Sequence, residues 1–202
     1  PQRRIQPVRV LGIDPGSAAT GYGVVETAAE RTVRTNPSGA TVLGYKLVEC
    51  GVLRTPPRAG LPDRLRELHE GVSELIDRHQ PDVVAVESVF YGRNARSALA
   101  LGQARGIVLL AAAQRGRQVR ELPPAEIKKA VTGTGAATKE QVQYMLARLL
   151  NLREAPRPAD ASDGVAAAVA YLLTSHMRLV ERPAGRGGLA QRALNGRGSP
   201  TA

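Results

Sequence analysis

The hydrophobic pattern at the start of the chain predicts three β-strands. The mostly apolar segment Val8 to Ile13 is one strand candidate, and stretches with β-branched or aromatic residues cover Gly21 to Glu26 and Val42 to Val52. A polar, turn-rich linker from Glu30 to Ala40 separates the second stretch from the third. Because we interpret the connections as short, we expect the three strands to pair as an antiparallel meander.

The middle of the chain alternates helix-like and strand-like patterns. Between Leu61 and His79 apolar residues recur at steps of three and four with charged residues between them, which predicts an amphipathic helix. The short apolar run Asp82–Ser88 is typical of a central parallel strand covered on both faces. The stretch Asn94–Arg115 is rich in Ala, Gly and Leu and has few charges, so we expect a helix buried in the core or in a subunit interface.

One further strand and three helices are predicted in the C-terminal half. Thr138 and Gln141 have the spacing of a capping box, which marks the start of the second of these helices. The predicted elements are, in order, Gln118–Pro124, Pro124–Val131, Thr138–Asn151 and Asp160–Val180. The whole order, βββαβαβααα, predicts an α/β domain in which the meander and a parallel βαβαβ half share one mixed sheet flanked by helices.

Composition favours one basic domain followed by a basic tail. The 202 residues suffice for a single domain with its own core, which we assign to residues 1–181. Residues 182–202 hold four arginines, five glycines and no acid, so we expect a disordered Gly/Arg-rich tail. The net charge of +10 and the isoelectric point near 10.6 attract polyanions such as nucleic acid, an acidic protein or an anionic membrane.

Neither a membrane span nor a secreted protein is expected. We find no apolar run near 18 residues, and the N-terminal sequence lacks the apolar region of a signal peptide. Cys50 is the only cysteine, which excludes an internal disulfide and fits a reducing compartment. We therefore expect a cytoplasmic protein.

Four carboxylates stand at places where the predicted fold could bring them together. Asp14 ends the first strand, Glu87 ends the central parallel strand, and Asp160 and Asp163 share one face of the last helix at its first turn. The carboxyl end of a parallel sheet is where ligands bind, and the last helix must pack on that sheet. Each acid also has a plainer interpretation: Asp14 as a turn residue, Glu87 as a solvated strand end, and the aspartate pair as helix capping.

Acids that converge in this way would repel one another without cations. Carboxylate oxygens suit Mg²⁺ or Mn²⁺, and the scattered histidines do not offer a zinc pattern. Two such ions can clamp a phosphodiester, activating water on one side and stabilising the leaving oxygen on the other. An acidic site within a basic protein is what a nuclease needs.

The motifs around these acids resemble those of the RuvC-type Holliday-junction resolvases. LGIDPGSAATGYGVVE is similar to the first family motif and VVAVESVFYGRNARSALALGQARG to the second, with Asp14 and Glu87 as their acids. PRPADASDGVAAAVAY resembles the third, and Asp160 and Asp163 match its closing pair. The likeness covers roughly Val8 to Arg178. It implies a ribonuclease H-like fold and a crossover junction endodeoxyribonuclease that uses Mg²⁺ or Mn²⁺, with two ions per active site.

The resemblance also implies residues that contact DNA. Phe90 matches an aromatic residue that the family places against bases at the junction, and Tyr91 beside it is expected to assist, although core packing is an alternative for Phe90. Lys128 and Lys139 match basic residues near the scissile phosphates. Arginines of the second motif, which are expected to contact phosphates, are Arg93, Arg96 and Arg105.

By the same resemblance the working unit is a homodimer. The family buries the helix equivalent to Asn94–Arg115 at the dimer interface, and paired sites on a symmetric dimer nick two opposing strands of a four-way junction in recombination and repair. The RuvA–RuvB branch-migration complex is the implied partner. In the mechanism we infer, Asp14 bridges the two ions, Glu87 and Asp163 or Asp160 complete their shells, and a bound water attacks the phosphate.

Three alternatives remain at this stage. YqgF-like proteins share the fold and the Asp-Pro-Gly opening but act on RNA, and they are shorter. An actin-like or sugar-kinase ATPase would need a second, duplicated domain that 202 residues cannot supply. A non-catalytic basic scaffold would bind nucleic acid without cutting it. The connection Thr27–Gly44 and the basic tail exceed the family pattern, and we expect them to add contacts with DNA or protein.

Overall fold

The computed structural model describes residues 7–16, 18–27, 34–35, 41–42, 44–56, 58–88 and 95–180, and it leaves undescribed the side chains of 34–35, 41–42, 96 and 176–180. The strands of the described part are β1 (Arg9–Asp14), β2 (Ala19–Thr27), β3 (Arg34–Thr35), β4 (Thr41–Val42), β5 (Tyr45–Arg54), β6 (Val83–Glu87) and β7 (Gln118–Leu122). Its helices are α1 (Leu61–His79), α2 (Ala95–Gln114), α3 (Pro124–Thr132), α4 (Lys139–Leu149) and α5 (Ala159–Val180). The predicted tail, residues 182–202, lies outside the described residues.

Five strands form the mixed sheet that the sequence predicts, in the order β5-β2-β1-β6-β7. Strand β2 is antiparallel to both β1 and β5, whereas β6 is parallel to β1 and to β7. The meander and the parallel half therefore meet at β1, in the middle of the sheet. This central position places the carboxyl ends of β1 and β6 side by side.

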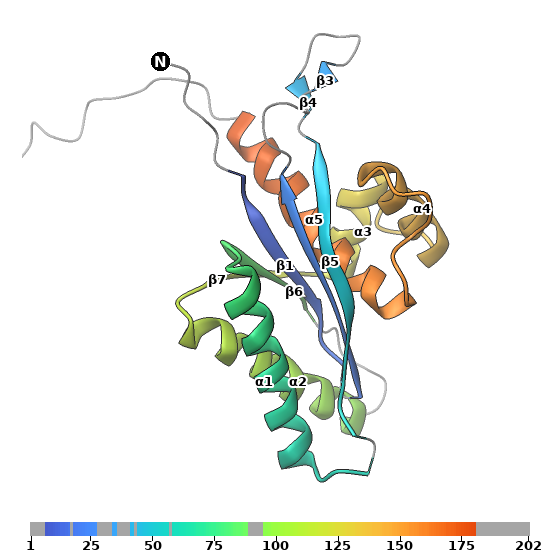
Figure 1. Cartoon of the computed structure of the whole chain (residues 1–202). Helices are drawn as coiled ribbons and strands as arrows, with labels where there is room; N and C mark the ends of the chain where they lie inside the picture. Colours follow the sequence, from blue (N-terminus) through green and yellow to red (C-terminus); the bar gives the residue numbers. More distant parts are fainter. Residues whose placement is uncertain are drawn as a thin grey trace, which may run out of the picture.

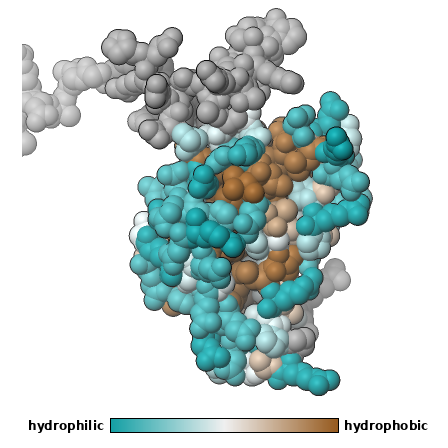
Figure 2. Space-filling view, in the orientation of Figure 1, coloured by the Kyte–Doolittle hydropathy of each residue, from teal (hydrophilic) through white to brown (hydrophobic). Residues whose placement is uncertain are grey.

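The helices cover the two faces of the sheet in separate layers (Figure 1). Helices α1 and α2 pack with Leu11, Ile13, Val84 and Val86 in one buried cluster. Helices α3, α4 and α5 pack with the alternate side of the same strands in a second cluster. The space-filling view accordingly shows apolar surface only in patches within a mostly hydrophilic face (Figure 2).

The ends of several elements differ from the prediction. The linker predicted from Glu30 to Ala40 contains β3, which pairs with β4, so part of it is a short two-stranded ladder. The third strand of the meander is β5, which begins at Tyr45 and not at Val42, because Val42 belongs to β4. Helix α4 starts as predicted, since the Thr138 side chain and the Gln141 side chain each bond the other's backbone N–H.

Helix α2 is partly buried and partly open. Ala104, Val108, Ala111 and Ala112 enter the core, while Leu99 is 65% exposed and Leu110 47%. By length and composition alone Ser97–Gln114 is apolar enough to cross a membrane, which corrects the expectation that no stretch comes near that length. A helix in the core of a soluble protein can be equally long and apolar.

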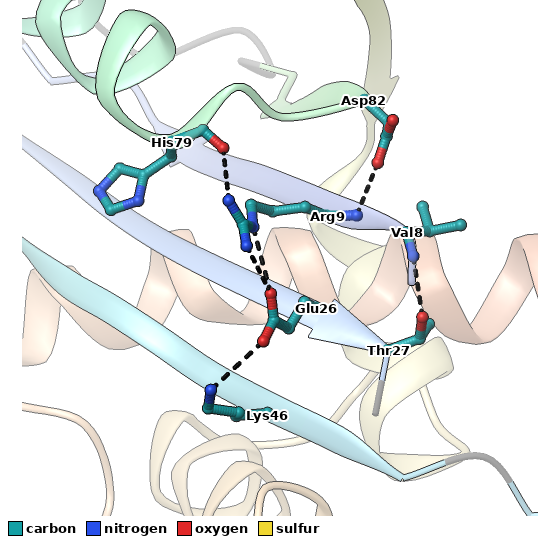
Figure 3. Close-up of polar contacts among 7 residues, drawn as sticks. All are labelled: Val8, Arg9, Glu26, Thr27, Lys46, His79 and Asp82. Atoms are coloured by element: carbon teal, nitrogen blue, oxygen red, sulfur yellow. Dashed lines mark hydrogen bonds and ion pairs between the residues drawn. The ribbon is translucent and has the colours of Figure 1, made fainter. Parts of the chain in front are cut away.

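Polar contacts tie down the amino end of β1 (Figure 3). The Arg9 guanidinium donates to the Glu26 carboxylate at 2.8 Å and to the backbone oxygen of His79 at 2.8 Å. The backbone N–H of Arg9 donates to Asp82 at 2.8 Å, and Lys46 pairs with Glu26 at 3.3 Å. These contacts join three strands to the end of α1.

Candidate active site

A rigid turn follows Asp14 at the end of β1. The Thr20 hydroxyl, 1% exposed, accepts a hydrogen bond from the Gly16 N–H at 3.2 Å and donates one to the Gly16 oxygen at 3.1 Å. A Cβ at Gly16 would lie 1.9 Å from the oxygen of Ala19, so only glycine fits this turn. The Asp-Pro-Gly signal predicts the turn, but the sequence analysis missed the part that Thr20 plays.

Strand alternation directs Asp14 and Glu87 to the same face. Val10 and Ala85 pack in the cluster with α5, and side chains two residues apart on a strand point the same way. Asp14 stands four residues after Val10, and Glu87 stands two after Ala85. Both carboxylates therefore face α5 and α3, at the ends of neighbouring parallel strands.

These two acids line one pocket of about 210 Å³ with residues from α3, α4 and α5. Its other lining residues are Pro124, Ile127, Lys128, Lys139, Val142, Asp163 and Ala166. The sequence analysis missed its apolar members, Pro124, Ile127, Val142 and Ala166, because at helical spacing they read as ordinary core. The pocket thus combines three carboxylates, two ammonium groups and an apolar wall.

Glycines on β1 and β2 let α5 lie directly against the sheet. A Cβ at Gly21 would stand 1.8 Å from the backbone oxygen of Asp160, and one at Gly12 would stand 2.1 Å from that of Gly164. Helix α5 therefore approaches closely enough to bring Asp163 into the pocket. These glycines are not among the site residues predicted from the sequence.

The start of α5 is also held from the preceding loop. The Ser162 hydroxyl is fully buried and donates to the backbone oxygen of Pro156 at 2.6 Å. Ser162 lies between Asp160 and Asp163 in the sequence, so this bond fixes the turn that carries both acids. A Ser in that place has no motif of its own that would have drawn attention to it.

Burial and neighbouring carboxylates raise the pKa values of two pocket acids, Asp14 and Glu87. Burial, the Asp163 charge and the Asp160 charge raise the pKa of Asp14 from 3.8 to about 6, against the opposing effect of Lys139. Burial and then the charges of Asp14 and Asp163 raise the pKa of Glu87 from 4.5 to about 7. Such perturbed carboxylates in a pocket are typical of a functional site.

Lys139 places a positive charge directly on one of the pocket acids. Its ammonium donates to Asp163 Oδ2 at 2.7 Å, and this bond raises the pKa of Lys139. Lys128 lines the same pocket and lowers the pKa of Glu87 through space. Both lysines, which the family resemblance places near the scissile phosphates, line the pocket together with the acids.

The other predicted residues have mixed outcomes. Asp160 does not line the pocket, although its charge acts on Asp14 and on Lys139. Phe90, Tyr91 and Arg93 lie outside the described residues, and of Arg96 only the backbone is described. Arg105, an expected phosphate contact, forms an ion pair with Glu121 of β7.

The donor set suits a hard divalent cation. The three pocket acids supply carboxylate oxygens, which are the ligands of Mg²⁺, Mn²⁺ and Ca²⁺, and burial followed by the neighbouring carboxylates raises the pKa values of two of them, Asp14 and Glu87. Within the described residues, however, no three acidic or His/Cys side chains gather closely enough for a ready-made metal site. One of the three pocket acids, Asp163, is paired with Lys139.

Comparison with known proteins shows the family of the chain. The family model described as crossover junction endodeoxyribonuclease RuvC matches residues 10–171, a range that contains all four acids. The chain belongs to the RuvC family. RuvC proteins are nucleases that depend on a divalent metal ion, which agrees with the carboxylates of the pocket.

Curated RuvC relatives match along most of their length. The chain is 45% identical over 162 residues to crossover junction endodeoxyribonuclease RuvC of Desulforamulus reducens, covering 80% of this chain and 91% of that protein. It is 48% identical over 172 residues to the RuvC of Chlorobaculum parvum, covering 83% and 85% of the two chains. These matches identify the chain as an endodeoxyribonuclease of the RuvC type.

Solved structures agree on the fold. The Thermus thermophilus RuvC structure superposes with a TM-score of 0.71 at 33% identity, covering 84% of this chain and 96% of that one. The same protein in complex with a Holliday junction substrate gives 0.70 at 32% identity over the same shares of the two chains. The yeast mitochondrial resolvase Ydc2, at 14% identity and a TM-score of 0.55, shares the ribonuclease H-like fold.

Proposed function

We propose that this chain resolves four-way DNA junctions by symmetric paired nicks, acting in recombination and DNA repair. The observation that carries the proposal is the pocket where Asp14, Glu87 and Asp163 meet beside two lysines, in a chain of the RuvC family. The relative from Thermus thermophilus, which is known in complex with a Holliday junction, supports the choice of substrate. The reaction is hydrolysis of one phosphodiester in each of two opposing strands.

Asp14, Glu87 and Asp163 are the residues that would hold Mg²⁺ or Mn²⁺, with two ions per site. Asp163 is preferred over Asp160 as a direct ligand because it lines the pocket, whereas Asp160 adds charge from its margin. When bound, two such ions activate a water and stabilise the leaving oxygen of the phosphate. The protein contributes the positions of the carboxylates, fixed by the turn after β1 and by the close packing of α5.

The two lysines are suited to the phosphate. Lys128 and Lys139 come from α3 and α4 and both line the pocket, so a phosphate that entered it would meet positive charge on that side. We assign base and phosphate contacts beyond the pocket to Phe90, Tyr91, Arg93 and Arg96 on the strength of the family motif. Contacts of that kind hold the junction in place and do not perform the chemistry.

A homodimer would place two such pockets on one junction. Helix α2 supports this assembly, because Leu99 and Leu110 are exposed on it and a groove beside α1 is lined by Leu65, Ile107 and Leu110. Apolar surface of this kind usually marks an interaction site. A two-fold symmetric pair would then cut two strands at equivalent positions. We place the enzyme in the cytoplasm, with RuvA–RuvB as the partner that moves the junction.

The test compares a labelled four-way junction with a linear duplex of the same sequence. Each is incubated with the purified protein in Mg²⁺, in Mn²⁺ and in chelator. The proposal expects paired symmetric nicks in the junction alone, lost in chelator. Binding without incision in every metal would favour a non-catalytic scaffold, and cleavage of RNA in preference to the junction would favour a YqgF-like activity.

A further inference from the structure

The ammonium of Lys139 is bonded to a carboxylate oxygen that would otherwise be available to a metal ion. Its bond to Asp163 Oδ2 is 2.7 Å long, and the Asp163 side chain is only 26% exposed. Asp163 is also one of the three acids that line the pocket. A cation is therefore already present at the acids, and the protein supplies it.

Helix α4 presents this cation from a fixed point on a flexible arm. Thr138 and Gln141 close the capping box with bonds of 2.8 and 3.3 Å, so the backbone at Lys139 is held at the first residue of the helix. The Lys139 side chain is 49% exposed, and a lysine ammonium stands on a flexible stem of four carbons. The ammonium can thus leave Asp163 for solvent or a nearby phosphate while the helix stays in place.

The arrangement of the acids agrees with such an exchange. In the described residues no three potential ligands come together at metal spacing, although Asp14, Glu87 and Asp163 share one pocket. Of these three carboxylates, that of Asp163 is bonded to Lys139. The lysine therefore stands where it would compete with another cation for this carboxylate.

We propose that Lys139 is a resident counter-cation that competes with the metal ion for Asp163, so that loading the site releases its ammonium toward the DNA phosphate. The inference rests on the proposed function, since it assumes that the pocket takes a metal. It explains how the protein tolerates three neighbouring carboxylates before a metal ion binds: the Lys139 charge offsets part of their mutual repulsion. It would also link metal binding to binding of the DNA substrate, because an ammonium that is no longer paired with Asp163 would be available to a phosphate.

The competing view is that the ion pair is structural and persists when metal is bound. In that case Lys139 would not affect metal affinity beyond the small influence of any nearby charge. A charge-removing variant alone does not separate the two views. The experiment therefore needs one variant that removes the pair, one that keeps it, and one that removes a charge from the same pocket without it.

The measurement is titration calorimetry of Mn²⁺, and separately Mg²⁺, into metal-free protein without DNA. We expect Lys139→Met to bind the metal about 5-fold more tightly than the wild type, the scale of losing a partly exposed ion pair. Lys139→Arg keeps the charge and the pair and should bind no more tightly than the wild type. Lys128→Met should tighten binding by less than Lys139→Met, because Lys128 acts on the acids through space.

Thermal unfolding provides a second readout. Without metal, Lys139→Met should melt at a lower temperature than the wild type, because the acids lose their counter-cation. With saturating Mn²⁺ the difference should shrink or reverse. If Lys139→Met does not fold, Lys139→Gln replaces it in both measurements.

The outcomes separate this inference from the proposed function. Metal affinity that is unchanged or weaker in Lys139→Met, while the wild type binds metal, would overturn the competition and leave the proposed function intact. If Lys139→Met and Lys128→Met tighten metal binding equally, the effect comes from the net charge of the pocket alone, and the competition for Asp163 is also overturned. A wild-type protein that binds neither metal would remove the basis of both.

Discussion

The acidic side chains at the two ends of strand β1 differ in how far positive charges within the protein neutralise them. At the amino end Arg9 meets Glu26 at 2.8 Å, and Lys46 adds a second cation to the same carboxylate (Figure 3). Burial alone would raise the pKa of Glu26, but the bonds from Arg9 and Lys46 outweigh it and lower that pKa. At the carboxyl end Asp14 and Glu87 have raised pKa values, and among the described residues the ion pair at this pocket is between Lys139 and Asp163.

The difference distinguishes charges that hold the fold from charges kept for chemistry. Each charged partner at the amino end is satisfied within the protein, which joins β1, β2, β5 and the end of α1. The carboxyl end keeps an excess of negative charge that costs stability in the absence of a cation. Stability given up in this way at one end of a strand is typical of functional sites.

The largest expected effect comes from Asp14→Asn. The variant keeps the size of the side chain and removes the charge, so it should fold but lose metal-dependent cleavage by roughly 10³-fold or more, about 4 kcal/mol of transition-state stabilisation. Junction binding should survive, because phosphate contacts come from basic side chains. The measurement is a cleavage rate on a labelled four-way junction beside a gel-shift assay in chelator. Cleavage at the wild-type rate would show that Asp14 is only a turn residue.

A smaller and opposite effect is expected from Glu26→Gln. Loss of this carboxylate leaves the partly buried Arg9 without its charged partner, which should lower the free energy of unfolding by about 1–2 kcal/mol. The cleavage rate measured well below the melting temperature should not change. Chemical denaturation gives the stability, and Asp63→Asn, which removes an exposed pair with Arg66, is the control expected to have little effect. A loss of cleavage without loss of stability would mean that the two ends are not separate.

The smallest effect is the pH dependence of the metal-free protein. Asp14 and Glu87 have folded pKa values of about 6 and about 7, above their ordinary values of 3.8 and 4.5. A raised pKa adds stability that is fully present below the unfolded value and is lost as the pH rises through the folded value. The melting temperature in chelator should therefore fall by a few degrees between pH 5 and 8.

Differential scanning calorimetry of the wild type and of Asp14→Asn,Glu87→Gln tests this. The double variant should show a flatter pH profile over the same range, because both titrating acids are gone. The amino-end acid Glu26, with its lowered pKa, does not titrate in this window and serves as an internal contrast. Identical profiles for the two proteins would show that the carboxyl end is not short of positive charge.

Much of the fold could be predicted from the sequence because its signals are local. The helical spacing of apolar residues predicted α1 from Leu61 to His79, and the capping box predicted the start of α4 after Thr138. The apolar run ending at Glu87 gave β6 as a central parallel strand. The prediction was wrong at the short ladder of β3 and β4, because a strand of only two residues is too short to show a periodic pattern.

The charged members of the pocket were predictable, but its apolar wall and its arrangement were not. Sequence alone identified Asp14, Glu87, Asp163 and the two lysines, since strand ends, a helix start and the family motifs mark them. It did not separate Asp160 from Asp163, which stand three residues apart on α5. Only the packing of α5 against Gly12 and Gly21 decides which of them enters the pocket.

The sequence by itself therefore determined the order of the elements and the chemical types at the site, because both depend on neighbouring residues. The tertiary structure decided that Lys139 neutralises Asp163 and that Arg105 pairs with Glu121. It also decided how far burial raises the pKa of Asp14 and of Glu87. Those properties depend on distances between side chains far apart in the chain, and electrostatic energies change steeply with such distances once water is excluded.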